Sequence, residues 1–242
     1  KYNYLKSGRN PWQDPYWYRT EVVLPKSYRG KKVWLILNGI NYRADVWVNG
    51  RQVADKKDIV GMFRRFKLDI TGYAHAGANN CIAIKIYQVD HPGVPTPGTQ
   101  LKVFGPVRGH SYDIFKDETL KISGGWDCAP VVRDRNMGIY QKVIVEATDE
   151  VLIENPFVVT TLPKSTTMPM KVDTGLAKVN IKLEVRNTSA KLVEGKVNAW
   201  ITLINEVKFP TYTKHMEGYL KPIKLTKKVA LRAGERKVVE LT

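Results

Sequence analysis

Cysteine is scarce in this sequence, and long apolar runs are absent from it. Only Cys81 and Cys128 among the 242 residues are cysteine, which excludes a framework of several disulfides and leaves a single bridge open. Neither stands near another cysteine or a histidine at the spacing of zinc ligands, and we expect no metal ion and no other cofactor. No apolar run approaches the roughly 18 residues of a membrane-spanning helix, so we expect no membrane partner.

A secretory leader is missing too, because no basic stretch followed by an apolar run opens the sequence. The first residue is Lys1 rather than methionine, so this absence says little, and we expect the chain to be an excised piece of a longer protein. The hydrophobic share of 43% and the aromatic share of 10% predict a folded chain rather than a disordered one.

Acidic residues are the minority among the charged ones. The sequence has 39 Lys and Arg against 23 Asp and Glu, a net charge of +16, and such an excess suits a nucleic acid or another polyanion. The excess is spread evenly, because residues 1–148 carry 23 basic and 13 acidic residues and residues 149–242 carry 16 and 10. Without a block of like charges, a solvated basic surface is the simpler interpretation, and we expect no nucleic-acid partner.

Helical periodicity is also missing, and alternation with a period of two takes its place. Apolar or alternating runs predict strands at residues 33–37, 44–48, 51–53, 82–86 and 139–146. Asn49-Gly50 predicts a hairpin, because a type I′ turn needs positive φ at both central residues. Residues 33–37 are apolar on both faces, which predicts a strand buried between two layers. The predicted fold class is all-β.

A second set of strands begins near Asp149. Its alternating runs predict strands at residues 152–159, 179–185, 197–203, 222–231 and 235–241. Five or more strands in about 90 residues are typical of an immunoglobulin-like sandwich, here without its disulfide. We therefore predict two domains, residues 1–148 and residues 149–242.

The weakly patterned stretch from His91 to about Val132 is long enough to suggest a functional loop. Within it, two glycines precede Trp126 and Asp127. An indole can pack on the C–H face of a sugar while a neighbouring carboxylate accepts hydrogen bonds from its hydroxyls. The alternative is structural, with the tryptophan closing the end of the sandwich and the aspartate capping a turn. Trp126 and Asp127 are the candidate substrate-binding residues.

The sequence offers few groups of residues that could form a catalytic site. Glycosidases use two carboxylates about 5 to 9.5 Å apart, and the one suggestive dipeptide, Asn205-Glu206, is more simply a solvated turn. The sequence has no Gly-x-Ser-x-Gly elbow, no P-loop and no Gly-x-Gly-x-x-Gly, and its four histidines are scattered. No catalytic residue is assigned.

Several motifs resemble one family in the order in which they occur. They are residues 17–20 (Trp-Tyr-Arg-Thr), 33–41, 44–50 (Ala-Asp-Val-Trp-Val-Asn-Gly), 66–71, 79–80 and 134–140. Together with Gly125-Trp126-Asp127, they are similar to the N-terminal sugar-binding domain of glycoside hydrolase family 2, closest to its β-mannosidase and exo-β-glucosaminidase branch. Residues from about 150 to 242 are similar to the immunoglobulin-like second domain of that family.

The resemblance implies a galactose-binding-like jelly-roll sandwich, then an immunoglobulin-like sandwich, and then a (β/α)₈ barrel that carries the catalytic glutamates of a retaining β-glycosidase. It implies that Trp126 and Asp127 belong to a loop of the terminal-sugar subsite, and that Asn205-Glu206 takes no part in catalysis. The chain alone should then be inactive. Cys128 departs from the family, where a bulkier residue such as tryptophan is common, and this leaves the sugar preference open.

The expected partners are a terminal β-linked sugar and the missing catalytic domain, and the expected location is periplasmic or secreted. Two other functions stay open. An autonomous pair of carbohydrate-binding modules would bind oligosaccharides as the isolated chain. A structural sandwich that binds polyanions would do so with steep salt dependence.

Overall fold

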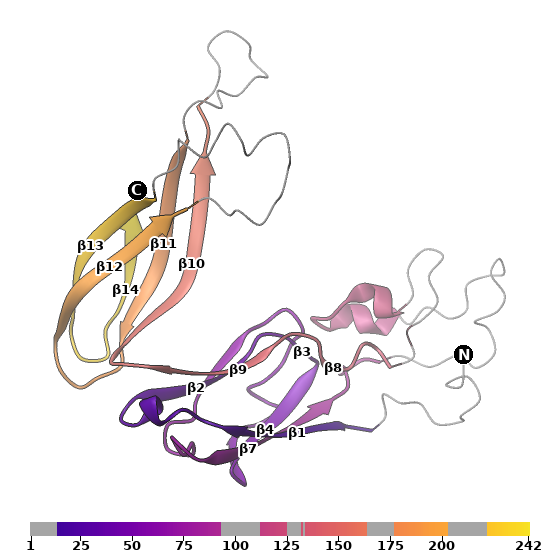
Figure 1. Ribbon diagram of the computed structural model, residues 1–242. Coiled ribbons are helices and arrows are strands. Elements are labelled where there is room, and N and C mark those ends of the chain that lie inside the picture. The colour runs from indigo at the N-terminus through magenta and orange to yellow at the C-terminus, as the bar shows by residue number, and fades with distance from the viewer. Residues whose placement is uncertain (1–13, 93–111, 125–131, 133, 164–176, 203–221) are drawn as a thin grey trace, which may run out of the picture. The chain divides into compact units, whose positions relative to one another are not determined.

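The computed structural model describes residues 14–92, 112–124, 132, 134–163, 177–202 and 222–242 (Figure 1). The chain divides into two compact units, Lys1–Thr148 (unit 1) and Asp149–Thr242 (unit 2). The described residues form strands and three short 3₁₀ helices, η3 (Lys26–Tyr28), η4 (Tyr112–Lys116) and η5 (Lys121–Gly124). The all-β prediction is therefore confirmed. No helix among these residues is long and apolar enough to cross a membrane.

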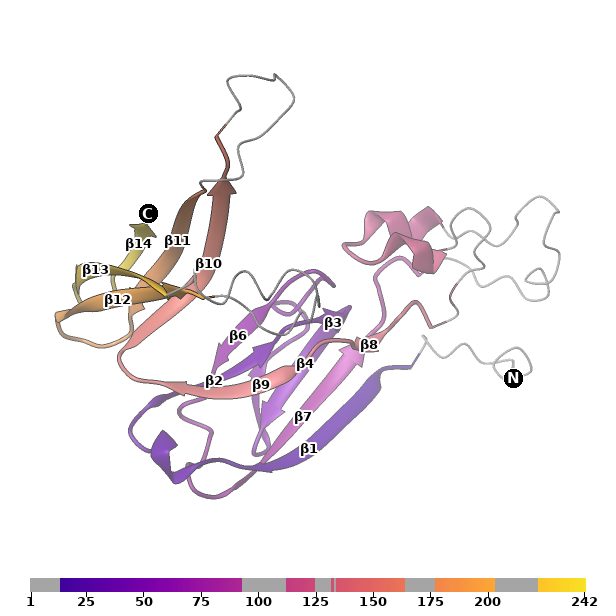
Figure 2. The same cartoon turned by 45° about the horizontal axis from the view of Figure 1, so that its top comes forward.

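Unit 1 contains a four-stranded antiparallel sheet in the order β1-β7-β4-β5 (Figure 2). Its strands are β1 (Tyr16–Val23), β7 (Asn79–Tyr87), β4 (Arg43–Val48) and β5 (Arg51–Ala54). The predicted hairpin joins β4 to β5, with φ of 49° at Asn49 and 78° at Gly50. The turn places Asn49 beyond the strand, where its side-chain oxygen accepts a hydrogen bond from the Cys81 backbone at 2.8 Å.

A second sheet and a short strand pair complete unit 1. The sheet has the order β6-β2-β9, and the pair is β3-β8. Their bounds are β6 (Phe66–Asp69), β2 (Lys32–Leu37), β9 (Val143–Thr148), β3 (Ile40–Asn41) and β8 (Gly138–Ile139). The apolar faces of both sheets meet in one buried core that includes Leu35, Val46 and Ile84. The apolar pattern of β2 is matched by burial on both faces, because Trp34 is buried as well as Leu35.

The strand predicted at residues 139–146 is interrupted. Ile139 ends β8, and Val143 begins β9 after three residues without strand pairing. The backbone N–H groups of Tyr140 and Gln141 both donate to the carbonyl of Gly39, at 3.2 and 3.3 Å. A Cβ at Gly39 would lie 2.5 Å from the Tyr140 ring, so glycine is needed there. The chain changes partner from β3 to β2 at this point, which alternation alone does not reveal.

Unit 2 contains a three-stranded sheet, β10-β11-β14, and a two-stranded sheet, β12-β13, all antiparallel. The strands are β10 (Val151–Thr161), β11 (Lys178–Asn187), β12 (Val193–Ile201), β13 (Ile223–Leu231) and β14 (Arg236–Leu241). Leu183, Val197 and Val239 lie in the core that the two sheets share. Pro156 falls within β10, where a register shift between Glu154 and Phe157 accommodates it.

Candidate functional site

The predicted substrate-binding residues Trp126 and Asp127 lie outside the described residues, and so does Asn205-Glu206. The structure does describe the residues that flank the Trp-Asp motif on both sides. The N–H of Val132 donates to the carbonyl of Ser123 at 3.0 Å, so residues 123 and 132 are held together. Ser123 itself is fully buried. The described residues on the two sides of the motif are therefore joined directly to each other.

A tight turn follows Val132. Arg135 and Asn136 have φ of 56° and 54°, the left-handed region, and the N–H of Met137 donates to the carbonyl of Asp134 at 3.0 Å. The Asp134 carboxylate accepts the N–H of Asn136 at 2.9 Å, which stabilises this backbone path. Gly138 follows with φ of 145°, and a Cβ there would lie 2.7 Å from the Tyr18 hydroxyl.

Asn41, at the end of β3, fixes this turn from the opposite side. Its side chain is fully buried, and its amide nitrogen donates to the carbonyls of Arg135 and Asn136 at 3.0 and 3.1 Å. Its amide oxygen accepts a hydrogen bond from the hydroxyl of buried Thr119 at 2.8 Å. One side chain therefore joins β3, the turn and the segment after η4.

Arg135 is a buried cation, with 1% of its surface exposed. Its Nε donates to the carbonyl of Pro92 at 2.7 Å, and its Nη1 donates to the carbonyl of Val132 at 2.6 Å. Burial lowers the pKa of Arg135, and the neighbouring Asp134 acts in the opposite direction. Pro92 and Val132 stand next to the two segments left undescribed, residues 93–111 and 125–131, so Arg135 ties the flanks of both together.

His91 and Asp117 form a second link between the same regions. The Asp117 side chain is 2% exposed, and its two oxygens accept hydrogen bonds from the His91 backbone N–H and from His91 Nδ1, each at 2.7 Å. The Asp117 carboxyl group thus contacts both the backbone and the ring of His91. The pair anchors the end of the segment that follows β7 to the segment after η4.

This polar cluster (Asn41, His91, Asp117, Thr119, Ser123, Arg135 and Asn136) is a support rather than a reaction centre. Its side chains bond mainly to backbone groups and to one another. Within the described part of the chain, no group of three or more His, Cys, Asp or Glu could hold a metal ion. Sequence reasoning covered residues 33–41 and 134–140 only as family motifs and gave no role to Asn41 or Thr119, because a buried polar contact across about 80–95 residues leaves no local signal.

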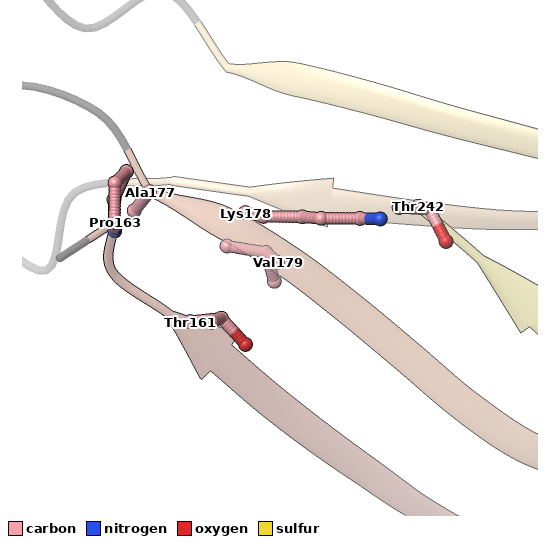
Figure 3. Close-up of a pocket in the computed structure, with 6 residues that line it drawn as sticks. All are labelled: Thr161, Pro163, Ala177, Lys178, Val179 and Thr242. Carbon is pink, nitrogen blue, oxygen red and sulfur yellow. The ribbon is translucent and has the colours of Figure 1, made fainter.

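An open depression of about 550 Å³ lies in unit 2 (Figure 3). Thr161, Pro163, Ala177, Lys178, Val179 and Thr242 line it. Figure 3 shows these side chains at the ends of β10, β11 and β14, with only one ammonium group and two hydroxyls among them. Convergent polar groups, which mark most ligand sites, are not found among these lining residues.

The described residues of each unit form an antiparallel β-sandwich, so the protein is of the all-β class. The chain belongs to the glycosyl hydrolase 2 galactose-binding domain-like family, whose model matches residues 6–141. The family and the branch predicted from the sequence are thereby confirmed.

Two curated relatives illustrate the branch. An exo-β-D-glucosaminidase of Amycolatopsis orientalis is 30% identical over 186 residues, which is 76% of this chain and 14% of the relative. A mannosylglycoprotein endo-β-mannosidase of Lilium longiflorum is 35% identical over 129 residues, 53% of this chain and 12% of the relative. The chain thus spans about a seventh of the length of these relatives.

A crystal structure of an exo-chitosanase from Amycolatopsis orientalis resembles the described fold. The TM-score is 0.61 at 27% identity, and the match covers 94% of this chain and 20% of that one. A β-glucuronidase of Bacteroides uniformis, at 17% identity and a TM-score of 0.55, shares the fold. Both units therefore have counterparts in known family 2 structures.

Proposed function

We propose that this chain is the non-catalytic N-terminal part of a retaining family 2 β-glycosidase. Unit 1 and unit 2 would support a (β/α)₈ barrel that carries both catalytic carboxylates. Residues 125–131 would contribute Trp126 and Asp127 to the subsite for the terminal β-linked sugar. The observation that carries this proposal is the similarity of nearly the whole chain to about a fifth of an exo-chitosanase.

The polar cluster supports the proposed role of the loop. A short segment that must present two side chains to a sugar needs fixed ends, and Ser123, Val132 and Arg135 supply them. The buried hydrogen bonds of Asn41 hold the turn behind that segment. By analogy with the relatives named above, the sugar is a β-linked glucosaminide or mannoside, and the enzyme acts in the periplasm or outside the cell.

The test is an Asp127→Ala substitution in the full-length enzyme. A charged acceptor on a sugar hydroxyl is worth about 1.5–3 kcal/mol where water is excluded. The value of kcat/KM should then fall roughly 10- to 150-fold, with little change in the melting temperature. Intact catalysis with a melting temperature lowered by several degrees would show that Asp127 caps a turn.

Glu206→Gln is the matched control. It should leave kcat/KM unchanged if Asn205-Glu206 takes no part in catalysis. The isolated chain should hydrolyse no nitrophenyl β-glycoside, because both carboxylates of a retaining glycosidase must lie in one site. Turnover by the isolated chain that disappears in Glu206→Gln would contradict the proposal.

A further inference from the structure

The outer face of the β1-β7-β4-β5 sheet carries three aromatic side chains. On β7, Ile82, Ile84 and Ile86 enter the core, so Ala83, Lys85 and Tyr87 point to the other face. Trp17 on β1 lies directly opposite Lys85, and Trp47 on β4 lies opposite Ala83. The Trp17 and Trp47 rings pack at a tilt of 32°, with centroids 5.2 Å apart.

Trp17 presents much of its indole to solvent. Its exposed fraction is 58%, although tryptophan side chains are highly buried on average. A single exposed aromatic residue needs no explanation. Here, however, the Trp47 ring packs against the exposed ring, and Tyr87 lies on the neighbouring strand of the same face. The result is a rigid aromatic surface on a sheet rather than on a loop.

Two lysines stand over these rings. Lys85 Nζ lies 5.3 Å from the centroid of the Trp17 ring and 5.1 Å from that of Tyr87, and Lys56 Nζ lies 4.8 Å from the Tyr87 centroid. Among the residues that the structure describes, no carboxylate forms an ion pair with either ammonium group. By contrast, the arginines of the same face are paired: Arg19 with Glu21, and Arg43 with Asp90.

The carboxylate opposite Lys85 already accepts hydrogen bonds from other groups. Asp45 lies directly opposite Lys85 in the register of β4 and β7, yet its oxygens accept the Tyr87 hydroxyl at 2.6 Å and the Lys56 backbone N–H at 2.8 Å. The hydroxyl of Tyr87 therefore donates to Asp45, and the two ammonium groups keep donors free for a ligand.

We propose that this aromatic face (Trp17, Trp47, Tyr87, Lys56 and Lys85) binds an oligosaccharide that contains uronic acids. The C–H face of one pyranose packs on the exposed indole of Trp17, and carboxylates of the same chain pair with Lys85 and Lys56. The charge complementarity selects an acidic sugar over a neutral one. Glu21 and Asp45 lie on the same sheet, and their negative charges would repel the continuous line of phosphates of a nucleic acid. A nucleic acid is therefore the less favoured ligand. This goes beyond the proposed function, because it needs unit 1 alone.

The experiment titrates the chain with tetragalacturonate at low ionic strength and follows binding by calorimetry. The fully methyl-esterified tetragalacturonide, which has the same backbone without the charges, is the matched ligand control. The acid should bind, and the ester should bind several-fold more weakly. Trp17→Ala should weaken binding of the acid by up to about tenfold, and Lys85→Gln by up to about fivefold.

Trp200→Ala is the matched control variant. Trp200 is 59% exposed and has Lys224 Nζ 5.8 Å from its ring centroid, but it lies in unit 2. This substitution should leave the affinity unchanged. Trp17 is exposed, so its loss should not unfold the chain, and a thermal melt of each variant checks this.

Four results would overturn the proposal. They are no detectable binding of the acid, equal binding of acid and ester, an equal effect of Trp17→Ala and Trp200→Ala, and loss of binding in Asp127→Ala. An equal effect of Trp17→Ala and Trp200→Ala would indicate that the acidic sugar is attracted only by the net positive charge of the chain. A competing DNA oligonucleotide would then displace the sugar. Loss of binding in Asp127→Ala would assign the bound sugar to residues 125–131 instead of the aromatic face. This result would overturn the aromatic-face proposal without contradicting the proposed function, so the two can fail separately.

Discussion

Unit 1 and unit 2 are both antiparallel sandwiches, yet they differ in the apolar and polar side chains that they bury. Among its described residues, unit 1 has a core of fifteen buried apolar residues and a buried polar cluster. Among the described residues of unit 2, the core contains seven buried apolar residues. Both units also expose large apolar side chains, such as Trp17 in unit 1 and Trp200 in unit 2. In the described part of the chain, the larger apolar core of unit 1 contributes more free energy of burial, which can offset the cost of its buried polar groups.

Asn41 in unit 1 and Asn187 in unit 2 are both buried, and the two differ in what they join. Asn41 in unit 1 bonds to a turn 94 residues away, next to the segment with the Trp-Asp motif. Asn187 in unit 2 donates to the carbonyls of Lys191, Leu231 and Arg232, which closes the ends of neighbouring strands. The first organises a candidate site, and the second organises the sandwich itself.

The largest effect is expected for Leu35→Ala in unit 1. Leu35 is 0% exposed in the centre of the core, and truncation of such a residue costs about 2–5 kcal/mol. If the units unfold separately, hydrogen exchange measured by mass spectrometry should accelerate in residues 1–148 and stay unchanged in residues 149–242. Leu183→Ala should do the reverse. One transition that shifts equally in both variants would show a single cooperative unit.

Asn41→Ala should cost less, about 1–3 kcal/mol, because the buried carbonyl of Arg135 and the partly buried carbonyl of Asn136 lose their donor. The Thr119 hydroxyl loses its contact with Asn41 and keeps only the weaker one with Met62. The loss should appear in denaturant unfolding of unit 1. Thr119→Val removes only the hydroxyl and should cost less than Asn41→Ala. Equal losses for the two variants would mean that the bonds from Asn41 to the turn contribute nothing.

Asn187→Ala should cost about 1 kcal/mol, at the lower end of that range. Two of its three acceptor carbonyls belong to the exposed residues Lys191 and Arg232, which can turn toward water when the amide is removed. Denaturant unfolding of unit 2 measures the change. A loss larger than that of Asn41→Ala would reverse the ranking of the two buried asparagines.

The strand content was predictable because alternation records which face of a sheet is buried. The patterns at residues 44–48, 82–86 and 179–185 correspond to β4, β7 and β11. The pattern missed β1, whose outer face carries the large aromatic Trp17 and therefore blurs the alternation. It also joined β8 to β9, because the change of partner at Tyr140 depends on a carbonyl of Gly39, which is remote in sequence.

The candidate site was predictable only as a motif. The dipeptide Trp126-Asp127 carries recognisable sugar chemistry, but nothing local indicates that Asn41 and Pro92 lie beside the turn that follows it. Similarly, Lys56 and Tyr87 are 31 positions apart in sequence and meet only because β4 places β5 and β7 on its two sides. Contacts of this kind follow from the sheet order, which a single sequence does not reveal.

The smallest effect is expected at the Arg43–Asp90 pair of unit 1, and it depends on pH. Its hydrogen bond with Arg43 lowers the pKa of Asp90 below the ordinary value of about 3.9. A carboxyl with a lowered pKa in the folded state contributes stability that is fully present above its unfolded pKa and is lost as the pH falls through the folded one. Because both side chains are partly exposed, the contribution is under about 1 kcal/mol. Asp90→Asn should therefore destabilise unit 1 slightly at pH 6, and the gap between variant and wild type in urea unfolding should narrow below pH 4. Unit 2 should respond to acid equally in both proteins, and a gap that stays constant with pH would show that Asp90 acts through its shape rather than through its charge.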